Sequence, residues 1–259
     1  MTEDERLLAH ARDLLQTAAN DGYLTHTAFL DLHQRSVLQA LQRETGRDTD
    51  LFFFGGYPDA ERTVALFVPR FFETETPEAL FSAQPELQML SLLRFEKDRF
   101  SSLSHRDYLG ALMGLGIKRE LLGDILVDET GAFLVCLESV AAFLLEHLRS
   151  AGRATLTGRK ADFFELSQRE EKITEQFASV ASLRLDCVLG AAFGFSRTKA
   201  AQIIESGVVF LNSVQVFKPD ARVGEGDKLV LRGKGKAVLS ELRGESKKGR
   251  AHIVLKKYQ

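Results

Sequence analysis

The stretch that decides the fold is SLRLDCVLGAAFGFSRTKAAQIIESGVVFLNSVQVFKPDARVGEGDKLVLRGKGK, residues 182–236. Apolar residues at helical spacing predict a short helix over 183–192, which ends before Gly194. Ser196 is the expected N-cap of a second helix, which stops at Gly207 because glycine commonly terminates helices. Strand-like runs separated by turn residues follow. The stretch therefore predicts two short helices that pack against a small sheet.

The charge of the chain divides at residue 180. The formal net charge is only −2, from 34 Lys+Arg and 36 Asp+Glu. Residues 1–180 hold 19 basic and 29 acidic residues, whereas residues 181–259 hold 15 and 7, so a body of −10 precedes a block of +8. Such a basic block indicates an anionic partner such as a nucleic acid. The alternative is a solvated basic face without a partner.

Basic residues gather at the two predicted helices and on the strands after them. Arg197 and Lys199 fall in the first turn of the second helix, where the helix dipole disfavours cations unless an anion binds there. Backbone N–H groups at that end, together with both cations, would hold a phosphate. The candidate contacts to a nucleic-acid backbone are Arg184, Arg197, Lys199, Lys218, Arg222, Arg232, Lys234 and Lys236.

Upstream of this block, the chain predicts a second domain with the order β-α-β-β-α-β. Strands are expected over 87–96, 124–128, 132–137 and 153–158, and Ser104 and Ser139 are the expected N-caps of the two helices. This order is that of ferredoxin-like domains, in which two helices cover one face of a four-stranded antiparallel sheet. The exposed aromatic motifs of RNA-recognition modules are not found in these strands, so the order alone assigns no function.

The N-terminal block is predicted to contain helices over 3–19 and 27–43 and a pair of strands within 51–69. A stretch rich in Pro and Glu, 73–85, is the expected first boundary. The fold class is therefore α+β. Its three domains are an N-terminal α/β block of helices and a hairpin (1–80), a ferredoxin-like domain (81–165) and a small C-terminal domain of two helices and a sheet (181–259), with 166–180 as a connecting strand or linker.

The compartment follows from the cysteines and the N-terminus. Cys136 and Cys187 each lie in an apolar run, which is typical of small core residues in a reducing cytoplasm. The first residues lack the basic-then-apolar order of a signal peptide. The most apolar stretch, 132–148, is interrupted by two glutamates and is too short to span a membrane. We expect a cytoplasmic protein with no membrane span.

Two strings that resemble catalytic motifs have simpler explanations. His105-Arg106-Asp107 begins like a kinase catalytic loop, but the other kinase motifs are missing, and Ser104 with Asp107 fits a capping box. Arg184-Leu185-Asp186 resembles the string around the catalytic aspartate of pseudouridine synthases. Here it opens the basic block, so Asp186 is expected to start a helix and pair with a neighbouring base. No P-loop, dinucleotide fingerprint or metal-spaced His/Cys cluster is found, and we expect no catalytic residue, metal or cofactor.

Several positions of the C-terminal stretch agree with a known domain. They are the Arg-Leu-Asp opening, Ser-Arg-x-x-Ala in the second helix, Ile-x-x-Gly-x-Val-x-x-Asn, and Gly-Asp before a late strand. This pattern resembles the RNA-binding domain named after small-subunit ribosomal protein S-four. The resemblance implies that Arg184, Arg197 and Lys199 meet an RNA backbone, supported by Lys218 and Arg232, and that Asn212 closes a turn. It places Leu185, Val188, Leu189, Ala200, Ile203 and Val208 in the core.

The upstream blocks extend the resemblance over most of the chain. The strings FFFGGYPDAERTVALFVP (52–69), SHRDYLGALMGLGIKRELLGDILV (104–127) and ASLRLD (181–186) resemble the YlmH family of bacterial proteins, which are encoded near cell-division genes. The resemblance implies a non-catalytic, cytoplasmic RNA-binding protein. It would act in ribosome-associated quality control, on a stalled large subunit carrying peptidyl-tRNA, through tRNA and large-subunit rRNA. Arg106 is then a secondary RNA or subunit contact.

Two other functions remain open at this point. The chain could be an RNA-modifying enzyme whose catalytic centre lies in residues 1–165 and whose last domain is an anchor. It could also be an adaptor for cell-division proteins, with incidental RNA binding. Loss of a specific modified nucleoside in cells lacking the protein would favour the enzyme, and a partner retained after nuclease treatment would favour the adaptor.

Overall fold

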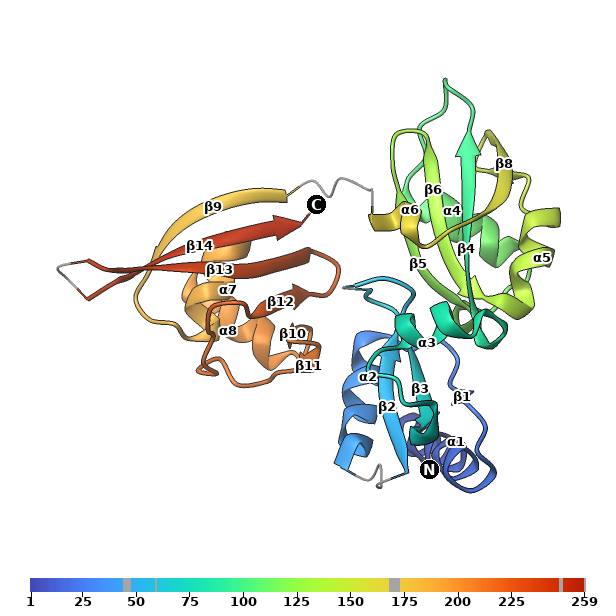
Figure 1. Ribbon diagram of the computed structural model, residues 1–259. Coiled ribbons are helices and arrows are strands. Elements are labelled where there is room, and N and C mark those ends of the chain that lie inside the picture. The colour runs from blue at the N-terminus through green and yellow to red at the C-terminus, as the bar shows by residue number, and fades with distance from the viewer. Residues whose placement is uncertain (44–47, 59, 168–172, 247–248, 259) are drawn as a thin grey trace. The chain divides into compact units, whose positions relative to one another are not determined.

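The computed structural model describes residues 1–43, 48–58, 60–167, 173–246 and 249–258. The chain forms two compact units, unit 1 (residues 1–169) and unit 2 (residues 170–259) (Figure 1). Both mix helices with strands, which confirms the predicted α+β class. Unit 1 holds 18 basic and 26 acidic residues and unit 2 holds 16 and 10, so their net charges are −8 and +6. The predicted division of charge therefore coincides closely with the division into units.

The N-terminal block of unit 1 begins with α1 (Glu3–Asp21), whose first turn is closed by a capping box between Thr2 and Glu5. The predicted strand pair is present as antiparallel β2 (Thr49–Phe54) and β3 (Val64–Pro69), and β1 (Thr25–His26) joins the free edge of β3.

The prediction of a helix over 27–43 is wrong for its first residues, because the helix begins at Leu32. Asp31 caps α2 (Leu32–Leu38), which continues as a 3-10 turn, η1 (Gln39–Arg43). Residues 27–30 are extended because they bond to the β2–β3 pair: the Thr27 N–H donates to Ala65 O, and Leu30 forms an isolated bridge with Thr63. Tertiary pairing thus overrides the helical spacing of Phe29 and Leu30.

The middle of unit 1 has the predicted β-α-β-β-α-β order. Its elements are β4 (Leu90–Lys97), α4 (His105–Gly114), β5 (Leu122–Val127), β6 (Gly131–Leu137), α5 (Glu138–His147) and β8 (Ala154–Ala161), with the short β7 (Ser150–Ala151) before β8. The sheet order is β5-β6-β4-β8-β7 and every neighbouring pair is antiparallel. Tyr108 and Leu112 of α4 and Ala141 and Leu144 of α5 belong to the same buried cluster. Both helices therefore cover one face of the sheet.

Of the two predicted N-caps in this domain, the one at α4 is confirmed and the one at α5 is wrong. At α4, the Ser104 N–H and hydroxyl both donate to the Asp107 carboxylate at 2.7 Å, which confirms the predicted capping box. At α5, the predicted cap Ser139 is wrong: the helix begins at Glu138, and Leu137 is the N-cap. Glu138 accepts hydrogen bonds from Ser91 and Lys160, so its side chain ties the helix start to β4 and β8.

The second face of this sheet packs against the N-terminal block. Leu92 and Val135 of the sheet share one buried cluster with Phe29 and Leu66 of the block. The stretch 73–85, predicted as a boundary, contains α3 (Pro77–Ala83) between two 3-10 turns, η2 (Arg70–Phe72) and η3 (Pro85–Leu87), and α3 adds Leu80 and Phe81 to this cluster. The blocks predicted as 1–80 and 81–165 thus share a core inside unit 1.

Polar contacts join the same two blocks. Arg62, in the β2–β3 connection, donates to Leu122 O at 2.9 Å and Phe29 O at 3.1 Å, while Asp124 accepts from the Tyr57 hydroxyl at 2.7 Å and from the Arg62 N–H at 3.1 Å. Arg119, in the 3-10 turn η4 (Arg119–Leu121), donates to the same strand, and burial beside Arg62 lowers its pKa to about 10. These arginines are structural, because backbone carbonyls take their N–H groups.

Unit 2 is a six-stranded antiparallel sheet with two helices on one face (Figure 1). Its elements are β9 (Ile173–Val180), α7 (Leu185–Phe193), α8 (Arg197–Glu205), β10 (Val209–Leu211), β11 (Val214–Gln215), β12 (Lys228–Leu231), β13 (Gly235–Glu245) and β14 (Ala251–Tyr258), in the sheet order β11-β10-β12-β13-β14-β9. β9 and β14 pair with each other, so residues 173–180 of the segment predicted as a connecting strand or linker form the last strand of this sheet, while 168–172 lie outside the described residues. In unit 1, the short α6 (Phe164–Ser167) follows β8.

The predicted details of unit 2 are largely confirmed. Ser196 accepts from the Lys199 N–H and Gly207 has a φ of 74°, as expected for the start and end of α8. Asn212 has a φ of 51° and bonds Asp227 and Lys228, so it closes the β10–β11 turn. Four of the predicted core residues, Leu185, Val188, Leu189 and Ala200, are buried, and Ile203 and Val208 pack against them.

Both cysteines are free, as predicted. Burial raises the pKa of the Cys136 thiol to about 12, so this cysteine is an unreactive core residue. Within the described residues, none of the helices has the length and apolar character that a membrane crossing demands.

Candidate nucleic-acid interface

One buried carboxylate joins the starts of the two helices in unit 2. Asp186 lies in the first turn of α7 and its side chain is 4% exposed. It accepts from Arg184, the N-cap of α7, at 3.1 and 3.2 Å and from Arg197, the first residue of α8, at 3.0 Å. We call these three residues the Asp186 cluster. The prediction that Asp186 starts a helix and pairs with a base is confirmed.

The loop between the helices makes this contact geometrically feasible. α7 ends at Gly194 with a φ of 73°, and the chain then folds back, so that the Phe195 N–H donates to Gly190 O at 2.9 Å. A Cβ at Gly190 would lie 2.9 Å from Phe195 O, so a side chain there would collide with backbone. Glycine at 190 and 194 thus lets α8 begin within reach of Asp186.

The cluster holds two guanidinium groups in place while leaving them accessible. The Arg184 and Arg197 side chains are 38% and 59% exposed, and Asp186 engages only some of their N–H donors. Burial alone would raise the pKa of Asp186, but the hydrogen bonds from Arg184 and Arg197 outweigh it and lower the pKa to about 2. The pair of arginines therefore keeps a fixed position at neutral pH, with donors that still point to solvent.

The Asp186 cluster changes the expected role of the α8 N-terminus. The sequence predicted that an external anion offsets the positive charges of the first turn. In the structure, Asp186 already pairs with Arg197, and the Ser196 hydroxyl accepts a hydrogen bond from the Lys199 backbone N–H at 3.3 Å. A phosphate would therefore meet mainly the exposed guanidinium edges and the exposed Lys199 side chain.

Two further predicted residues lie beside this cluster. Arg222 forms an isolated antiparallel bridge with Arg184. Residues directly opposite each other in such a bridge have their side chains on the same side, so these two side chains are neighbours. The Asp186 N–H donates to Pro219 O at 2.9 Å, which brings the turn that begins at Lys218 against the start of α7. Lys218 and Arg222 are both exposed. The structure thus brings together Arg184, Arg197, Lys199, Lys218 and Arg222.

The other three predicted residues of unit 2 lie on the β12–β13 hairpin. The Arg232 N–H donates to Val208 O, just beyond the C-terminal end of α8, whereas the Asp186 cluster is at its N-terminal end, about 13 Å of helix away. Lys234 is exposed in the turn, and the Lys236 ammonium lies 3.9 Å from the centre of the Tyr258 ring. Arg232, Lys234 and Lys236 therefore form a separate basic group.

The carboxylate of Asp186 predicts a pH-dependent stability for unit 2. Because its folded pKa of about 2 lies below the ordinary 3.8, Asp186 stabilises the fold above about pH 4, by about 2 kcal/mol, and this contribution is lost as the pH falls toward 2. Asp186→Asn should therefore lower the free energy of unfolding by about 2 kcal/mol at pH 7 and by about half of that at pH 3. Urea unfolding of both proteins at the two pH values checks this. A deficit that is the same at both pH values would contradict the ion-pair explanation.

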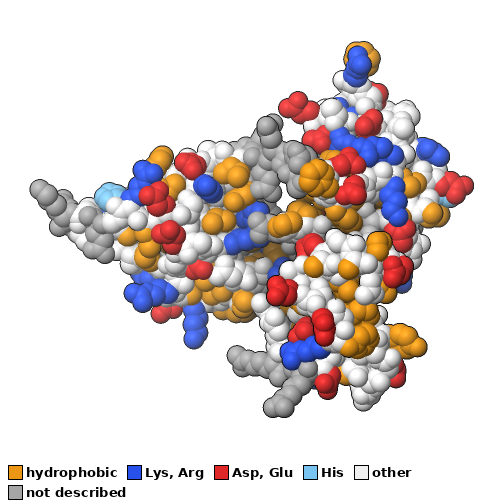
Figure 2. Space-filling view, in the orientation of Figure 1, with side chains coloured by type: hydrophobic (Ala, Val, Ile, Leu, Met, Phe, Trp, Pro, Cys, Tyr) orange, Lys and Arg blue, Asp and Glu red, His pale blue; other side chains and the backbone are white. Residues whose placement is uncertain are grey.

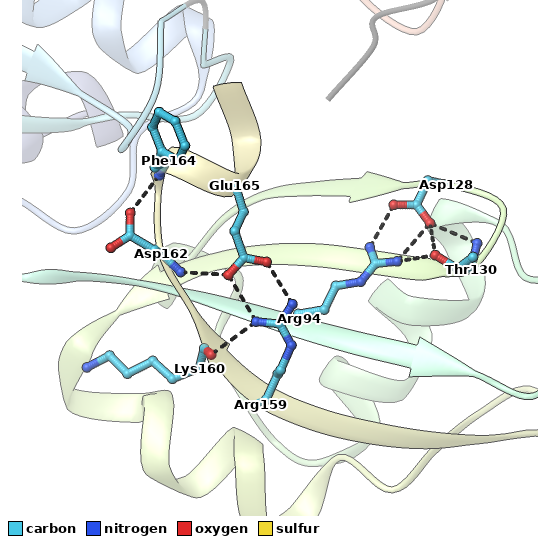
Figure 3. A network of polar contacts seen from close by, with 8 residues as sticks. All are labelled: Arg94, Asp128, Thr130, Arg159, Lys160, Asp162, Phe164 and Glu165. Carbon is cyan, nitrogen blue, oxygen red and sulfur yellow. Dashed lines mark hydrogen bonds and ion pairs between the residues drawn. The ribbon is translucent and has the colours of Figure 1, made fainter. Parts of the chain in front are cut away.

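In unit 1, Arg94 and Arg159, on the sheet face opposite the helices, are already engaged. Arg94 on β4 and Arg159 on β8 are directly opposite each other, yet they point to different carboxylates (Figure 3). Arg94 donates to Asp128 at 2.7 and 2.9 Å and lies over the Phe133 ring, and Arg159 donates to Glu165 at 2.7 and 3.0 Å. This face is therefore neutralised from within the protein. Arg106, the secondary candidate, is exposed on the opposite side, in the first turn of α4.

These two arginines form a matched pair for mutation. Arg94 is 6% exposed at its side chain and Arg159 is 51% exposed. Arg94→Ala should lower the free energy of unfolding by about 2 kcal/mol, because Asp128 and Thr130 lose a charged partner, whereas Arg159→Ala should cost less than about 1 kcal/mol. Denaturant unfolding measures both. Equal costs would contradict a structural role for the Arg94–Asp128 pair.

Unit 1 also contains a cavity of about 620 Å³ between the central sheet and the N-terminal block. Phe54, Phe81 and Phe163 form apolar walls, and Glu138 and Lys160 lie at the polar side. Glu78, Glu86 and Asp162 add negative charge to the lining, which does not suit a nucleic acid. Among the residues that the structure describes, no group of three or more His, Cys, Asp or Glu is placed to hold a metal ion.

Known proteins resemble this chain over most of its length. Residues 86–165, which contain the central sheet, match the family model described as "Putative RNA-binding domain in YlmH". The chain is 35% identical over 231 residues to "Ribosome-associated protein quality control protein P2" of Bacillus subtilis (strain 168), an alignment that covers 89% of this chain and 86% of the relative.

A solved structure shares the fold. The "Cell division protein ylmH from Streptococcus pneumoniae" aligns with a TM-score of 0.52 and 23% identity, over 64% of this chain and 94% of that one. This likeness concerns the fold alone, whereas the Bacillus relative matches nearly the whole length at higher identity. The chain therefore belongs to the YlmH family.

Proposed function

We propose that this chain is a non-catalytic, cytoplasmic RNA-binding protein that contacts tRNA and rRNA on the large ribosomal subunit and acts in quality control of stalled peptidyl-tRNA complexes. The Bacillus relative is named for ribosome-associated protein quality control, and the matched family model is described as an RNA-binding domain. The observation that carries the proposal is the Asp186 cluster, in which a buried carboxylate fixes the half-buried Arg184 and the exposed Arg197 beside Arg222 and Lys199.

The physical argument rests on preorganisation. A flexible arginine loses side-chain entropy when it binds a phosphate, and a side chain that is already held by a buried carboxylate loses less. The exposed N–H groups of Arg184 and Arg197 can then donate to phosphate oxygens, since guanidinium groups match them well. Contacts of this kind give affinity and position without base specificity, which suits a folded RNA surface.

The charge difference between the units indicates how such a complex is arranged. Unit 2, at +6, is attracted to RNA, and unit 1, at −8, is repelled by it overall. Unit 1 would therefore meet RNA only through a local basic surface, or would contact a basic ribosomal protein.

Co-sedimentation with purified large subunits tests the proposal. The full chain should pellet with large subunits that carry peptidyl-tRNA more than with vacant ones, and added salt should weaken this association. Equal recovery with and without peptidyl-tRNA would contradict a role on stalled complexes. A chain that stays in the supernatant with both would contradict ribosome binding. Retention of a protein partner after nuclease treatment would instead favour the adaptor role in cell division.

A further inference from the structure

Apart from Lys97, the basic residues of the matched domain, residues 86–165, fall into two groups according to their partners. In the first group, carboxylates or backbone carbonyls of the protein itself bind each cation. Its contacts are Arg94 to Asp128 (2.7 Å), Arg159 to Glu165 (2.7 Å), Lys160 to Glu138 (2.9 Å), Lys118 to Glu120 (3.8 Å), and Arg119 to the carbonyls of Leu122 and Gly123. The sheet face opposite the helices carries two of these ion pairs, Arg94–Asp128 and Arg159–Glu165, and packs against the N-terminal block. Both arginines on this face are therefore already engaged by carboxylates of the protein.

The second group lies at the end of the sheet where β4 stops. Arg99, Arg106, Arg149 and Arg153 are all exposed, and in the described part of the chain none of their side chains has a hydrogen bond or an ion pair. Together with Phe100 we call them the loop-end cluster. The carboxylates of Asp98 and Asp107, on the same loop and helix start, are bonded to Ser101 and Ser104 instead.

Backbone contacts bring the members of this cluster together. Lys97, the last residue of β4, is opposite Leu156 on β8, and the Leu156 N–H donates to Arg149 O at 2.8 Å. A Cβ at Gly152 would lie 3.7 Å from the Asp107 carboxylate, so the β7–β8 turn that carries Arg153 touches the first turn of α4, which carries Arg106. The loop after β4 projects from this end, and its tip shows a basic side chain beside an apolar one (Figure 2).

Phe100 is the apolar member of the cluster. It is 100% exposed, so it contributes nothing to the core. Hydrogen bonds nevertheless fix the loop backbone that carries it: Asp98 accepts from the Phe100 and Ser101 N–H groups, both at 3.0 Å, and from the Ser101 hydroxyl at 2.8 Å. An exposed aromatic ring on a loop at the same end of the sheet as four exposed arginines has the composition of a site that stacks an unpaired base and binds the adjoining phosphates.

We propose that the loop-end cluster is a second RNA contact, in which Phe100 stacks on an unpaired base and the arginines bind phosphates. The inference rests on the proposed RNA-binding function and locates the RNA surface of the matched domain away from its sheet. RNA fits better than a protein partner because the cluster combines unpaired cations with one ring instead of an apolar patch. The loop-end cluster also provides the local basic surface through which the acidic unit 1 would meet RNA.

A single-tryptophan variant tests the stacking directly. The chain has no tryptophan, so Phe100→Trp places the only indole at the loop tip. Titration with protein-free large-subunit rRNA should quench its fluorescence by at least about half, because a stacked base quenches indole. Phe71→Trp is the matched control at another exposed phenylalanine, 66% exposed in the N-terminal block, and should change little. Equal quenching of both, or of neither, would overturn the stacking.

A charge variant separates this inference from the proposed function. Arg99→Ala/Arg106→Ala/Arg153→Ala should lower the slope of log affinity for the same rRNA against log salt by about 2 to 3, with an unchanged melting temperature. An unchanged slope, when Arg184→Gln/Arg197→Gln does weaken binding, would overturn the second contact and leave the proposed function. If neither variant weakens binding, the proposed function itself fails. Weaker binding to intact subunits but not to rRNA would assign the cluster to a protein partner and overturn the RNA contact.

Discussion

Replacing Arg184 and Arg197 together is expected to weaken RNA binding about a hundredfold. Each guanidinium makes charge-assisted contacts worth about 1.5 kcal/mol, and each factor of ten in affinity corresponds to about 1.4 kcal/mol. The variant Arg184→Gln/Arg197→Gln is preferred to alanine, because glutamine can still donate to the buried Asp186 carboxylate. Fluorescence anisotropy with labelled tRNA and rRNA, at several salt concentrations, measures both the affinity and a salt slope lower by about 2.

A matched control distinguishes a site from a general charge effect. Arg243→Ala/Lys256→Ala removes the same charge from the strands β13 and β14 of unit 2, where these residues pair with Glu241 and Glu175. It should cost far less affinity than the double variant at the helix starts. Equal losses would mean that the overall charge of unit 2, and not the Asp186 cluster, provides the binding.

Phe29→Ala is expected to lower the stability of unit 1 by about 4 kcal/mol. Phe29 is 2% exposed, and a Cβ at Gly123 of β5 would lie 2.8 Å from its ring. Its N–H donates to Glu120 O at 2.8 Å, so ring and backbone both join the N-terminal block to the central sheet. Differential scanning calorimetry should show that both blocks melt together at a lower temperature. Two separate transitions would contradict a shared core.

The control for this variant is Phe71→Ala. Phe71 is in the same block, but its side chain is 66% exposed and stacks on Phe72. Its removal should change the free energy of unfolding by less than about 1 kcal/mol. A similar cost for both variants would mean that Phe29 has no special place in the core.

Phe29 also shows where sequence patterns were insufficient for the fold. Apolar residues at helical spacing predicted a helix from residue 27, but the hydrogen bonds from residues 27 and 30 to the β2–β3 pair keep this segment extended. Spacing reports only which face is apolar, whereas tertiary hydrogen bonds decide between helix and strand. Where local chemistry dominates, as at the Ser104–Asp107 capping box and the Gly194 and Gly207 termini, the predictions were confirmed.

The candidate site was predictable to the extent that it depends on local motifs. The Arg-Leu-Asp string indicated that Asp186 pairs with a base, and the structure places Arg184 and Arg197 on it. Charge counting could not show that Arg232, Lys234 and Lys236 lie on a separate hairpin. It also could not distinguish engaged cations such as Arg94 from the loop-end arginines Arg99 and Arg153, because carboxylates distant in sequence decide which cations are neutralised.

Cross-linking in cells tests the central claim most directly. RNA bound to the full chain under translational stress, when ribosomes stall, would be cross-linked, purified and sequenced, in parallel with the Arg184→Gln/Arg197→Gln variant. The account predicts that reads gather on tRNA and on large-subunit rRNA, and that the double variant loses most of them. Reads spread evenly over unrelated RNAs, or a variant that keeps the same tRNA and rRNA positions at the same yield, would contradict it.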